Sequence, residues 1–293
     1  MFIATLIAAD RLARGDISAA ADALRAAGVE PRAPEWIEPD SACDLAFAER
    51  AEDAQAALDG LIPGADWVVQ PARHRRKKLL AADMDSTMIN VECIDELADY
   101  AGVKEQVAEI TERAMHGELD FAGALRERVL LLQGLEEQVI DHCLAERIRP
   151  NPGAVTLVQT MKARGAETIL VSGGFTAFVE PIAKRIGFDR YEANVLGVRG
   201  GKLSGLTEGS IVDSRRKHDV LSEARKRLGL SPDETLAIGD GANDIPMVEE
   251  AGLGIAYRAK PALAAVADAR LDHHGLDALL WAQGIPRREW IEV

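Results

Sequence analysis

Residues 78–87 read KLLAADMDST, and this stretch decides the fold. The apolar run within Lys78–Ala82 predicts a short buried strand that ends directly before Asp83. Side chains two positions apart in extended backbone point the same way, so Asp83 and Asp85 face one site. Open α/β sheets place their ligands beyond the carboxyl ends of their strands. The stretch therefore predicts a strand of such a sheet with an acidic site at its end.

The sequence after this strand alternates between strand and helix patterns, which predicts a doubly wound parallel sheet with helices on both faces. Glu92 to about Arg149 has an almost entirely helical periodicity and is closed by Pro150–Gly153, so a helical insert follows the first strand. Gly200-Gly201 within Val195–Ile211 predicts a β-hairpin. The other predicted elements are strands at Thr168–Val171, Thr235–Ile238 and Leu253–Ala256, and helices at Thr176–Ile186, Ser214–Leu228 and around Pro246–Ala251.

Residues 1–72 have a different pattern, which is typical of a small α+β unit. The predicted order is β-α-β-β-α-β, which suits a ferredoxin-like sandwich. The sequence thus predicts two domains, residues 1–72 and residues 73–293, with the helical insert at about residues 90–150 of the second. The predicted strands and helices of the first domain are Phe2–Ala8, Ile17–Ala27, Trp36–Ile37, Ala42–Phe47, Glu52–Leu61 and Asp66–Val69.

The composition is that of an ordinary globular protein. Of the 293 residues, 47% are apolar and 28% are charged. No apolar run approaches the ~20 residues that a membrane helix requires, and the apolar start Met1–Ala9 is too short for a signal peptide. Cys43, Cys93 and Cys143 are far apart, which argues against a disulfide framework and a structural zinc site. We therefore expect a cytoplasmic protein.

The formal net charge of −14 argues against general nucleic-acid binding. An anionic substrate is compatible with this charge if local cations reverse the field at its site. The one basic block is Arg73–Lys78. It has two interpretations: a binding patch for an anionic partner or, as we favour, a solvated linker at the junction of the two domains.

The pair Asp83 and Asp85 brings two like charges together. Carboxylates ~4 Å apart repel each other by roughly 4 kcal/mol at an effective dielectric of 20, so the pair requires a cation, a shared proton or distance. A calcium loop is excluded, because its sixth position would be Met88 instead of glycine and its twelfth Ile94 instead of glutamate. A helix N-cap cluster stays open, since Asp, Ser and Thr all cap helices well.

Residues 239–246 form a second acidic stretch after an apolar strand. Its two glycines allow a tight turn beside a ligand, and Asp240 and Asp244 add two hard oxygen donors. With this strand beside the first one, the carboxylates of both strand ends would suit magnesium, together with waters and a phosphate oxygen. The alternative is a turn followed by a cap. We expect Asp244 both to cap the helix that contains Pro246 and to support the site.

Two further features suit an anionic ligand. Ser172-Gly173-Gly174 stands between a predicted strand and a predicted helix, and free N–H groups at a helix start bind phosphate well. The alternative for this stretch is an ordinary strand-to-helix turn. Lys217 lies on a predicted helix before the Asp240 strand, and by itself a lone lysine is most often a solvated surface residue.

The order of these four features resembles the haloacid dehalogenase (HAD) superfamily of phosphatases. Longer motifs resemble the phosphoserine phosphatase family within it, over about residues 76–280. Ala124, where this family often has serine, and Met88 are small departures. The motifs that carry the resemblance are Asp83–Thr87, Glu92–Leu97, Ala114–Phe121, Leu125–Val129, Ser172–Phe175 and Gly239–Asp244.

The resemblance implies a HAD-like, Rossmannoid fold with a mobile helical cap. It implies a magnesium-dependent phosphomonoester hydrolase that converts O-phospho-L-serine to L-serine and phosphate, the last step of serine biosynthesis. Asp83 would be the nucleophile that forms an aspartyl phosphate, and Asp85 the general acid and base. One Mg²⁺ per active site would be held by Asp83, the main-chain carbonyl of Asp85, and Asp240.

The same resemblance implies how the substrate binds. Glu92 would take its ammonium group and Arg128 its carboxylate, while Phe121 closes over the serine part. Its phosphate would be held by Ser172 and the Gly173 N–H with Lys217, and Asn243 would reach the phosphate or the metal shell.

Residues 1–72 lie outside these motifs. Their strand order resembles ACT-type regulatory domains, which often bind amino acids and pair between subunits. This implies serine as a regulatory ligand and a homodimer formed through the domain. Three other functions fit less well. Another phosphatase or a sugar phosphomutase on the same fold does not explain Glu92 and Arg128, and a receiver switch does not explain Asp85. An inactive amino-acid sensor does not require all of Asp83, Asp85, Lys217 and Asp240. Phosphothreonine or a phosphoprotein stays open as a side substrate.

Overall fold

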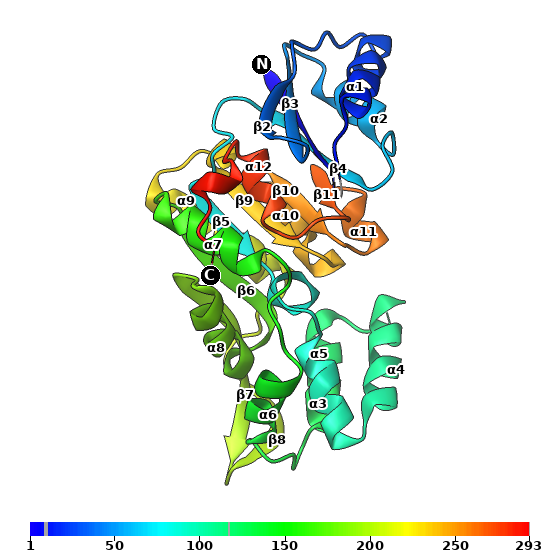
Figure 1. The fold of residues 1–293 in the computed structure, drawn as a ribbon. Helices are drawn as coiled ribbons and strands as arrows, with labels where there is room; N and C mark the ends of the chain where they lie inside the picture. Colours follow the sequence, from blue (N-terminus) through cyan, green and yellow to red (C-terminus); the bar gives the residue numbers. More distant parts are fainter. Residues whose placement is uncertain (9–10, 117, 293) are drawn as a thin grey trace.

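A computed structural model describes residues 1–8, 11–116 and 118–292. Ala9 and Gly117, which belong to stretches discussed above, lie outside the described residues. Figure 1 shows a small N-terminal sheet with two helices, a larger central sheet between helices, and a group of helices that extends away from the central sheet. Within the described residues, no helix has both the length and the apolar composition that crossing a membrane requires.

The central sheet has seven strands in the order β11-β10-β9-β5-β6-β7-β8. All neighbouring strands pair in parallel except β7 and β8, which form a hairpin. The predicted doubly wound α/β sheet is therefore confirmed. Its strands are β5 (Leu79–Ala82), β6 (Glu167–Phe175), β7 (Arg190–Arg199), β8 (Lys202–Glu208), β9 (Thr235–Gly239), β10 (Gly254–Tyr257) and β11 (Ala269–Leu271).

Helices cover both faces of the central sheet, and every residue of β5 is buried. Alternate side chains of β5 enter a cluster with α9 (Ser214–Leu228) and α10 (Ile245–Glu250) on one face. The others enter the main core with α7 (Ala154–Ala163), α8 (Thr176–Ile186) and α12 (Ala278–Ala282) on the opposite face. Burial on both faces explains why this strand is an unbroken apolar run in the sequence.

The N-terminal unit folds as β-α-β-β-α-β with the antiparallel strand order β2-β3-β1-β4. This is the order of a ferredoxin-like sandwich, so the α+β prediction is confirmed. Its elements are β1 (Phe2–Ala8), α1 (Arg14–Ala26), β2 (Glu35–Glu38), β3 (Ala42–Phe47), α2 (Ala51–Leu58) and β4 (Ala65–Pro71).

The insert after β5 is helical, as predicted, and one of its helices, α5, packs against β8. The two ends of the insert lie side by side, because Ile89 pairs with Pro150 and the side-chain amide of Asn151 donates to the carbonyls of Thr87 and Ile89. The boundaries of this cap and of the N-terminal domain stay predictions. The helices of the insert are α3 (Cys93–Ala101), α4 (Lys104–Met115), α5 (Phe121–Leu131) and α6 (Val139–Glu146).

Some elements differ from the sequence prediction. Strand β7 begins at Arg190, before the predicted hairpin, because its first half pairs with β6 and its second half with β8. The hairpin turn needs its glycines, since Gly200 and Gly201 have φ of +60° and +76°. Elements without a prediction are α7, β11, α12, α11 (Pro261–Ala264) and the short turns Met84–Met88, Pro232–Glu234, Ala242–Asp244 and Arg287–Glu289.

The N-terminal sheet is attached to the central domain through its second face, opposite α1 and α2. Ile7, Ala42 and Val68 on this face belong to the same core cluster as Trp281 of α12. The basic block contributes to the attachment. Arg75 donates to Asp44 of β3 at 2.6 Å and to the carbonyl of Ala282. The interpretation of the block as a solvated linker is therefore wrong for Arg75, and also for Lys77, which is 5% exposed and donates to the carbonyl of Asp233.

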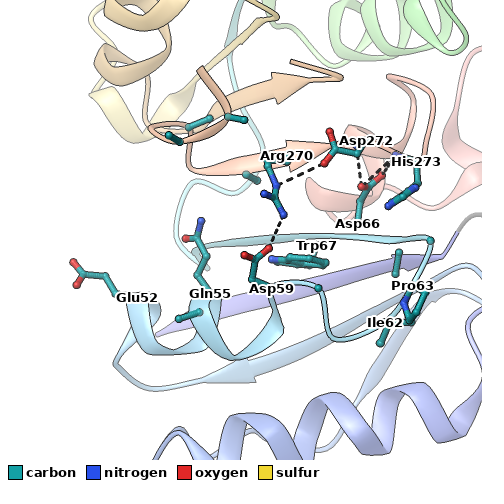
Figure 2. A pocket seen from close by; sticks show the side chains of 18 residues that line it. Glu52, Gln55, Asp59, Ile62, Pro63, Asp66, Trp67, Arg270, Asp272 and His273 are labelled. Atoms are coloured by element: carbon teal, nitrogen blue, oxygen red, sulfur yellow. Dashed lines mark hydrogen bonds and ion pairs between the residues drawn. The ribbon is translucent and has the colours of Figure 1, made fainter. Parts of the chain in front are cut away.

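A second polar contact joins the two parts through Asp66 of β4, which is 4% exposed. Its carboxylate accepts the backbone N–H groups of Asp272 and His273 (Figure 2). It also accepts the N–H of His274 and lies 2.7 Å from Nδ1 of that residue. Burial, the largest single cause, lowers the pKa of His274, but the hydrogen bond with Asp66, the backbone of Ala8 and the charge of Asp66 together outweigh it, so this pKa is raised. The contact between this imidazole and Asp66 therefore joins the N-terminal unit to the loop after β11, and the raised pKa favours its charged form.

This ion pair makes the stability of the protein depend on pH. Because the folded-state pKa of His274 is raised, its contribution is complete below the unfolded value of ~6.5 and is lost as pH rises through the folded value. We expect His274→Asn to lower the unfolding free energy by roughly 1–3 kcal/mol at pH 6 and by less at pH 9. Urea unfolding at both pH values measures this. His273→Asn is the matched control, since only its backbone N–H bonds Asp66, and a difference independent of pH would contradict the assignment.

Candidate active site

Three adjacent strands bring the predicted residues together. Strand β5 lies in the middle, between β9 and β6, and the chain changes direction across the sheet at this point. Asp83 follows β5, Asp240 follows β9, and Ser172 lies near the end of β6. The N–H of Asp83 donates to the carbonyl of Ile238, so β5 and β9 stay paired up to the site.

Three buried carboxylates and one buried lysine form the centre of the site. Asp83, Asp240 and Asp244 have carboxylate oxygens within 4.8 Å of one another. Nζ of Lys217, a residue that is 0% exposed, lies 2.6 Å from an oxygen of Asp83 and 2.6 Å from one of Asp244. Lys217 is therefore not the surface residue that a lone lysine usually is.

The charges in this centre are not balanced. Burial and the charge of Asp244 raise the pKa of Asp83 well above its ordinary value, although Lys217 opposes the shift. Burial and Asp244 also raise the pKa of Asp240, to about 6. Burial lowers the pKa of Lys217, but Asp244 and Asp83 outweigh it, so the lysine is a permanent cation. Lys217 and, at the edge of the centre, Lys260 at 3.5 Å from Asp240 are two ammonium groups beside three carboxylates, so a negative excess remains that a further cation would neutralise.

These residues fit a magnesium ion. Hard carboxylate oxygens from two strand ends are the donors that Mg²⁺ prefers, and the raised pKa values of Asp83 and Asp240 indicate that positive charge is required. The three carboxylates that come together include Asp244. The family resemblance implied a different third ligand of the metal, the main-chain carbonyl of Asp85. The identity and number of the metal stay proposals.

Asp244 stands at the N-cap position of α10, but the expected cap by its side chain is wrong. No side-chain hydrogen bond from Asp244 caps α10. Its Oδ2 instead accepts the N–H groups of Asp240 and Gly241, each at 3.1 Å, while Oδ1 accepts from Lys217. The carboxylate therefore turns back toward the strand end and fixes the loop that carries Asp240, which agrees with the expected supporting role.

Asp85 lies in the same pocket but has a different environment. It is 8% exposed, and its Oδ1 has no hydrogen-bond partner among the described residues. Burial and the neighbouring charge of Glu92 raise the pKa of Asp85 to about 7. A carboxyl group with this pKa is present in both protonation states near neutral pH, which suits a group that gives and takes a proton.

The loop at the end of β6 approaches Asp85 closely. A Cβ atom at Gly174 would lie 3.0 Å from Oδ2 of Asp85 and 3.1 Å from Oγ of Ser172, so any larger residue would displace one of them. The Gly174 N–H donates to Ser172 Oγ at 2.9 Å. A hydroxyl has one proton and two lone pairs, and the accepted bond leaves that proton for a ligand.

The helical insert contributes three of the predicted residues. Oε1 of Glu92 accepts from Ser86 at 2.7 Å, and Ser86 has φ of +55° in the turn after β5. The ring of Phe121 lies against the β6 loop, because a Cβ atom at Gly173 would be 2.8 Å from its Cζ. Nε of Arg128 donates to the carbonyl of Ala124 at 3.3 Å, and among the described residues no carboxylate lies within 4 Å of its guanidinium.

Arg128 nevertheless faces the acidic side of the site. Burial lowers its pKa, while the charges of Asp95, Glu92 and Asp85 act in the opposite direction. The Arg128 guanidinium therefore lies in the field of these negative charges, and its hydrogen bond from Nε to the carbonyl of Ala124 leaves its terminal nitrogens for a ligand carboxylate.

Two residues at the site carried no separate prediction. Thr87 is fully buried, and its Oγ1 lies 3.4 Å from Oδ1 of Asp240. Lys260 follows β10, donates its N–H to the carbonyl of Asp240 at 2.8 Å and places Nζ 3.5 Å from Asp240 Oδ2. Lys260 could have been predicted from the sequence, because it follows strand β10, which ends at the same edge of the sheet as β9. Asn243 lies in the loop between them, with its side-chain oxygen over Gly241.

A separate groove of about 470 Å³ lies between the N-terminal unit and the central domain, away from this centre (Figure 2). Trp67 lies along its floor, and Arg270 bridges the groove to Asp59 at 2.5 Å. Arg270, Asp59, Asp66 and Asp272 in this groove bond one another or the backbone, and none of the residues of the buried centre lines it, so we assign it no part of the chemistry.

The comparisons with known proteins agree with this geometry. Residues 77–252 match the model of the haloacid dehalogenase-like hydrolases. A phosphoserine phosphatase from Albidiferax ferrireducens is 46% identical over 215 residues, which cover 72% of this chain and 91% of the relative. The unliganded structure of a probable phosphoserine phosphatase from Vibrio cholerae is similar over 96% of this chain and 86% of its own, with 31% identity and a TM-score of 0.76.

A third similarity concerns a phosphoserine phosphatase solved as a phospho-aspartyl intermediate analogue. It is 42% identical, covers 70% of this chain and 98% of its own, and has a TM-score of 0.65. The family match includes all residues of the buried centre, which are Asp83, Lys217, Asp240 and Asp244. This chain belongs to the haloacid dehalogenase-like hydrolases and, within them, to the phosphoserine phosphatase family.

Proposed function

We propose that this protein hydrolyses O-phospho-L-serine to L-serine and phosphate through an aspartyl phosphate on Asp83. The observation that carries the proposal is the buried centre, in which Lys217 bonds Asp83 and Asp244 at 2.6 Å each, with Asp85 beside it at a pKa of about 7. Relatives named phosphoserine phosphatase support the choice of substrate. Such an activity would serve serine biosynthesis in the cytoplasm.

The reaction has two halves. A carboxylate oxygen of Asp83 attacks phosphorus, and the bond between phosphorus and the serine oxygen breaks while Asp85 gives that oxygen its proton. Asp85, now a carboxylate, takes a proton from a water molecule, whose oxygen attacks phosphorus and releases phosphate from Asp83. The raised pKa of Asp85 suits this exchange, because the same group must be an acid first and a base second.

Asp83, the main-chain carbonyl of Asp85, and Asp240 would hold one Mg²⁺, with Asp244 beside them. When bound, the ion supplies positive charge for the phosphoryl oxygens. Lys217 and the Ser172 hydroxyl, with the Gly173 N–H, would hold the other phosphoryl oxygens. Ser172 suits this role because its Oγ already accepts the Gly174 N–H and its proton is left for the ligand.

Residues of the insert would select the serine part. Glu92 would accept the substrate ammonium group, and the unpaired end of the Arg128 guanidinium would bind its carboxylate with two parallel bonds. Phe121, which lies against Gly173, would cover the substrate and exclude water. Asn243 would contact the phosphate or the metal ligands from the loop after β9.

The direct test is phosphate release from L-phosphoserine with and without magnesium, beside phosphothreonine and a sugar phosphate. Fast release from phosphoserine that requires magnesium is expected, with slow release from the others. Release from the other esters alone would keep a phosphatase and reject the proposed substrate. No release from any ester would reject the proposed reaction.

Arg128→Ala tests the substrate assignment. We expect it to lower kcat/KM for phosphoserine by about 10²-fold or more, since a bidentate bond to a carboxylate is lost. For p-nitrophenyl phosphate, which has no carboxylate, the change should be within about threefold. Arg126→Ala is the matched control, because Arg126 is an exposed arginine on the same helix. Equal losses on both substrates would remove Arg128 from substrate selection.

The N-terminal unit would regulate the enzyme by binding serine and pairing two chains. Its ferredoxin-like strand order supports this, as in ACT-type domains. Size measurement in solution and activity assays with added L-serine test the two parts separately. A monomer that serine inhibits only by competition with the substrate would reject both.

A further inference from the structure

Asn194 is a buried asparagine that none of the chemistry above uses. It is 1% exposed and lies in β7, next to the irregularity where β7 pairs with the end of β6. Its Nδ2 donates to the carbonyl of Gly173 at 2.8 Å and to the carbonyl of Val212 at 3.4 Å. Its Oδ1 accepts the N–H of Val212 at 2.8 Å. One side chain thus joins two loops of the central domain.

The first loop is the one proposed to hold phosphate. The Gly173 carbonyl and the Gly174 N–H belong to one planar peptide group, so a bond that holds this carbonyl also orients that N–H. The N–H donates to Ser172 Oγ. Both residues are glycines and offer no side chain to fix the peptide, so Asn194 holds its carbonyl and Ser172 Oγ holds its N–H.

The second loop leads into α9. Val212 is followed by Asp213, which caps this helix by accepting the N–H of Arg216. Lys217, the next residue, extends from the same helical turn to Asp83 and Asp244. Asn194 holds both polar backbone groups of Val212, so it fixes the start of the helix that carries the lysine.

We propose that Asn194 is a positioning residue that sets the spacing between Ser172 and Lys217, the two side chains proposed to hold the phosphoryl oxygens. The inference rests on the proposed function and extends it to a residue that touches no substrate. A buried asparagine with all its bonds made could serve the fold alone. Its two partners, however, are Gly173 and Val212. They lie in the loop that carries Ser172 and in the loop that leads to Lys217, and the distance between these loops decides how well a phosphate fits.

The test uses Asn194→Leu in the full-length protein. Leucine has the same branching and adds no charge, but it cannot bond Gly173 or Val212. We expect the inhibition constant of inorganic phosphate to rise by at least about tenfold. KM should rise by a similar factor for phosphoserine and p-nitrophenyl phosphate, because both share the phosphoryl group. Asn194→Ser, which leaves a polar group and a smaller side chain, serves if the leucine variant does not fold.

Thr168→Val is the matched control. Thr168 is fully buried in β6 and bonds Asp189 at the opposite end of the sheet, so its loss also weakens the protein. It should leave phosphate inhibition unchanged. Binding is also measured as the rise of Tm with added phosphate, which needs no turnover and so separates this inference from the proposed substrate. Phosphate binding within twofold of wild type in the folded Asn194 variant, by both measures, would overturn the inference.

Discussion

Replacing Asp83 with asparagine is expected to lower turnover by roughly 10⁴-fold or more, the scale seen when a covalent nucleophile is removed. An amide cannot attack phosphorus at a useful rate, so no aspartyl phosphate forms. The fold should persist, because Lys217 keeps its 2.6 Å bond to Asp244. The variant should be at least as stable as wild type near neutral pH, since the raised pKa of Asp83 shows that its charged form is disfavoured in the folded protein.

Phosphate release and thermal unfolding of the same preparation check both parts of this expectation. Asp189→Asn is a suitable control. This aspartate bonds the backbone and hydroxyl of Thr168 far from the site, so its loss should reduce stability and leave turnover intact. Substantial turnover by the Asp83 variant would mean that another group attacks phosphorus.

Replacing Asp85 with asparagine is expected to lower turnover of phosphoserine by about 10²–10⁴-fold, the usual contribution of a general acid and base. The amide cannot protonate the serine oxygen or activate water. For p-nitrophenyl phosphate the first half should be nearly normal, because its leaving group departs without a proton. The variant should then release nitrophenolate in one fast burst equal to the amount of enzyme and continue slowly, since water attack on the intermediate still lacks a base.

Rapid-mixing measurements with the coloured substrate detect such a burst. The result is informative because the two roles of Asp85 separate in time. A uniform slowing of both substrates with no burst would assign Asp85 a role in binding or metal coordination instead of proton transfer.

Much of the fold follows from the sequence because the strands that carry the site are short, apolar and directly followed by polar site residues. The run before Asp83 predicts β5 almost residue for residue, since a strand buried on both faces has few alternatives to apolar residues. Elements that lack such a pattern were missed. Strand β11 has three residues, and its central Arg270 is exposed, so neither length nor periodicity marks it.

The candidate site was predictable only in part. Motif spacing pointed to the two aspartate pairs, but Lys217 alone resembles any surface lysine, and α9 is mostly polar around it. Its burial depends on where the sheet order puts that helix. The backward turn of Asp244 could not be predicted for a similar reason, because an aspartate before a helix serves equally well as a cap in isolation.

The basic block Arg73–Lys78 is a second case in which local sequence does not predict whether a charged side chain is buried. Six cationic or imidazole side chains in a row suggest exposure, yet Arg75 and Lys77 alternate inward and bond partners far away in the chain. Local charge does not reveal such partners. They become visible only when the two sheets are placed together.

This attachment also has a consequence for how the enzyme has diversified. The apolar face around Trp281 and Ala278 is covered here by Ile7, Ala42 and Val68 of the N-terminal sheet. A protein that consists of the catalytic part alone would expose that face to water, so we expect more polar residues at the positions of α12 where the N-terminal unit is missing. The residue types at the positions of α12 should therefore differ between relatives that have the N-terminal unit and relatives that lack it.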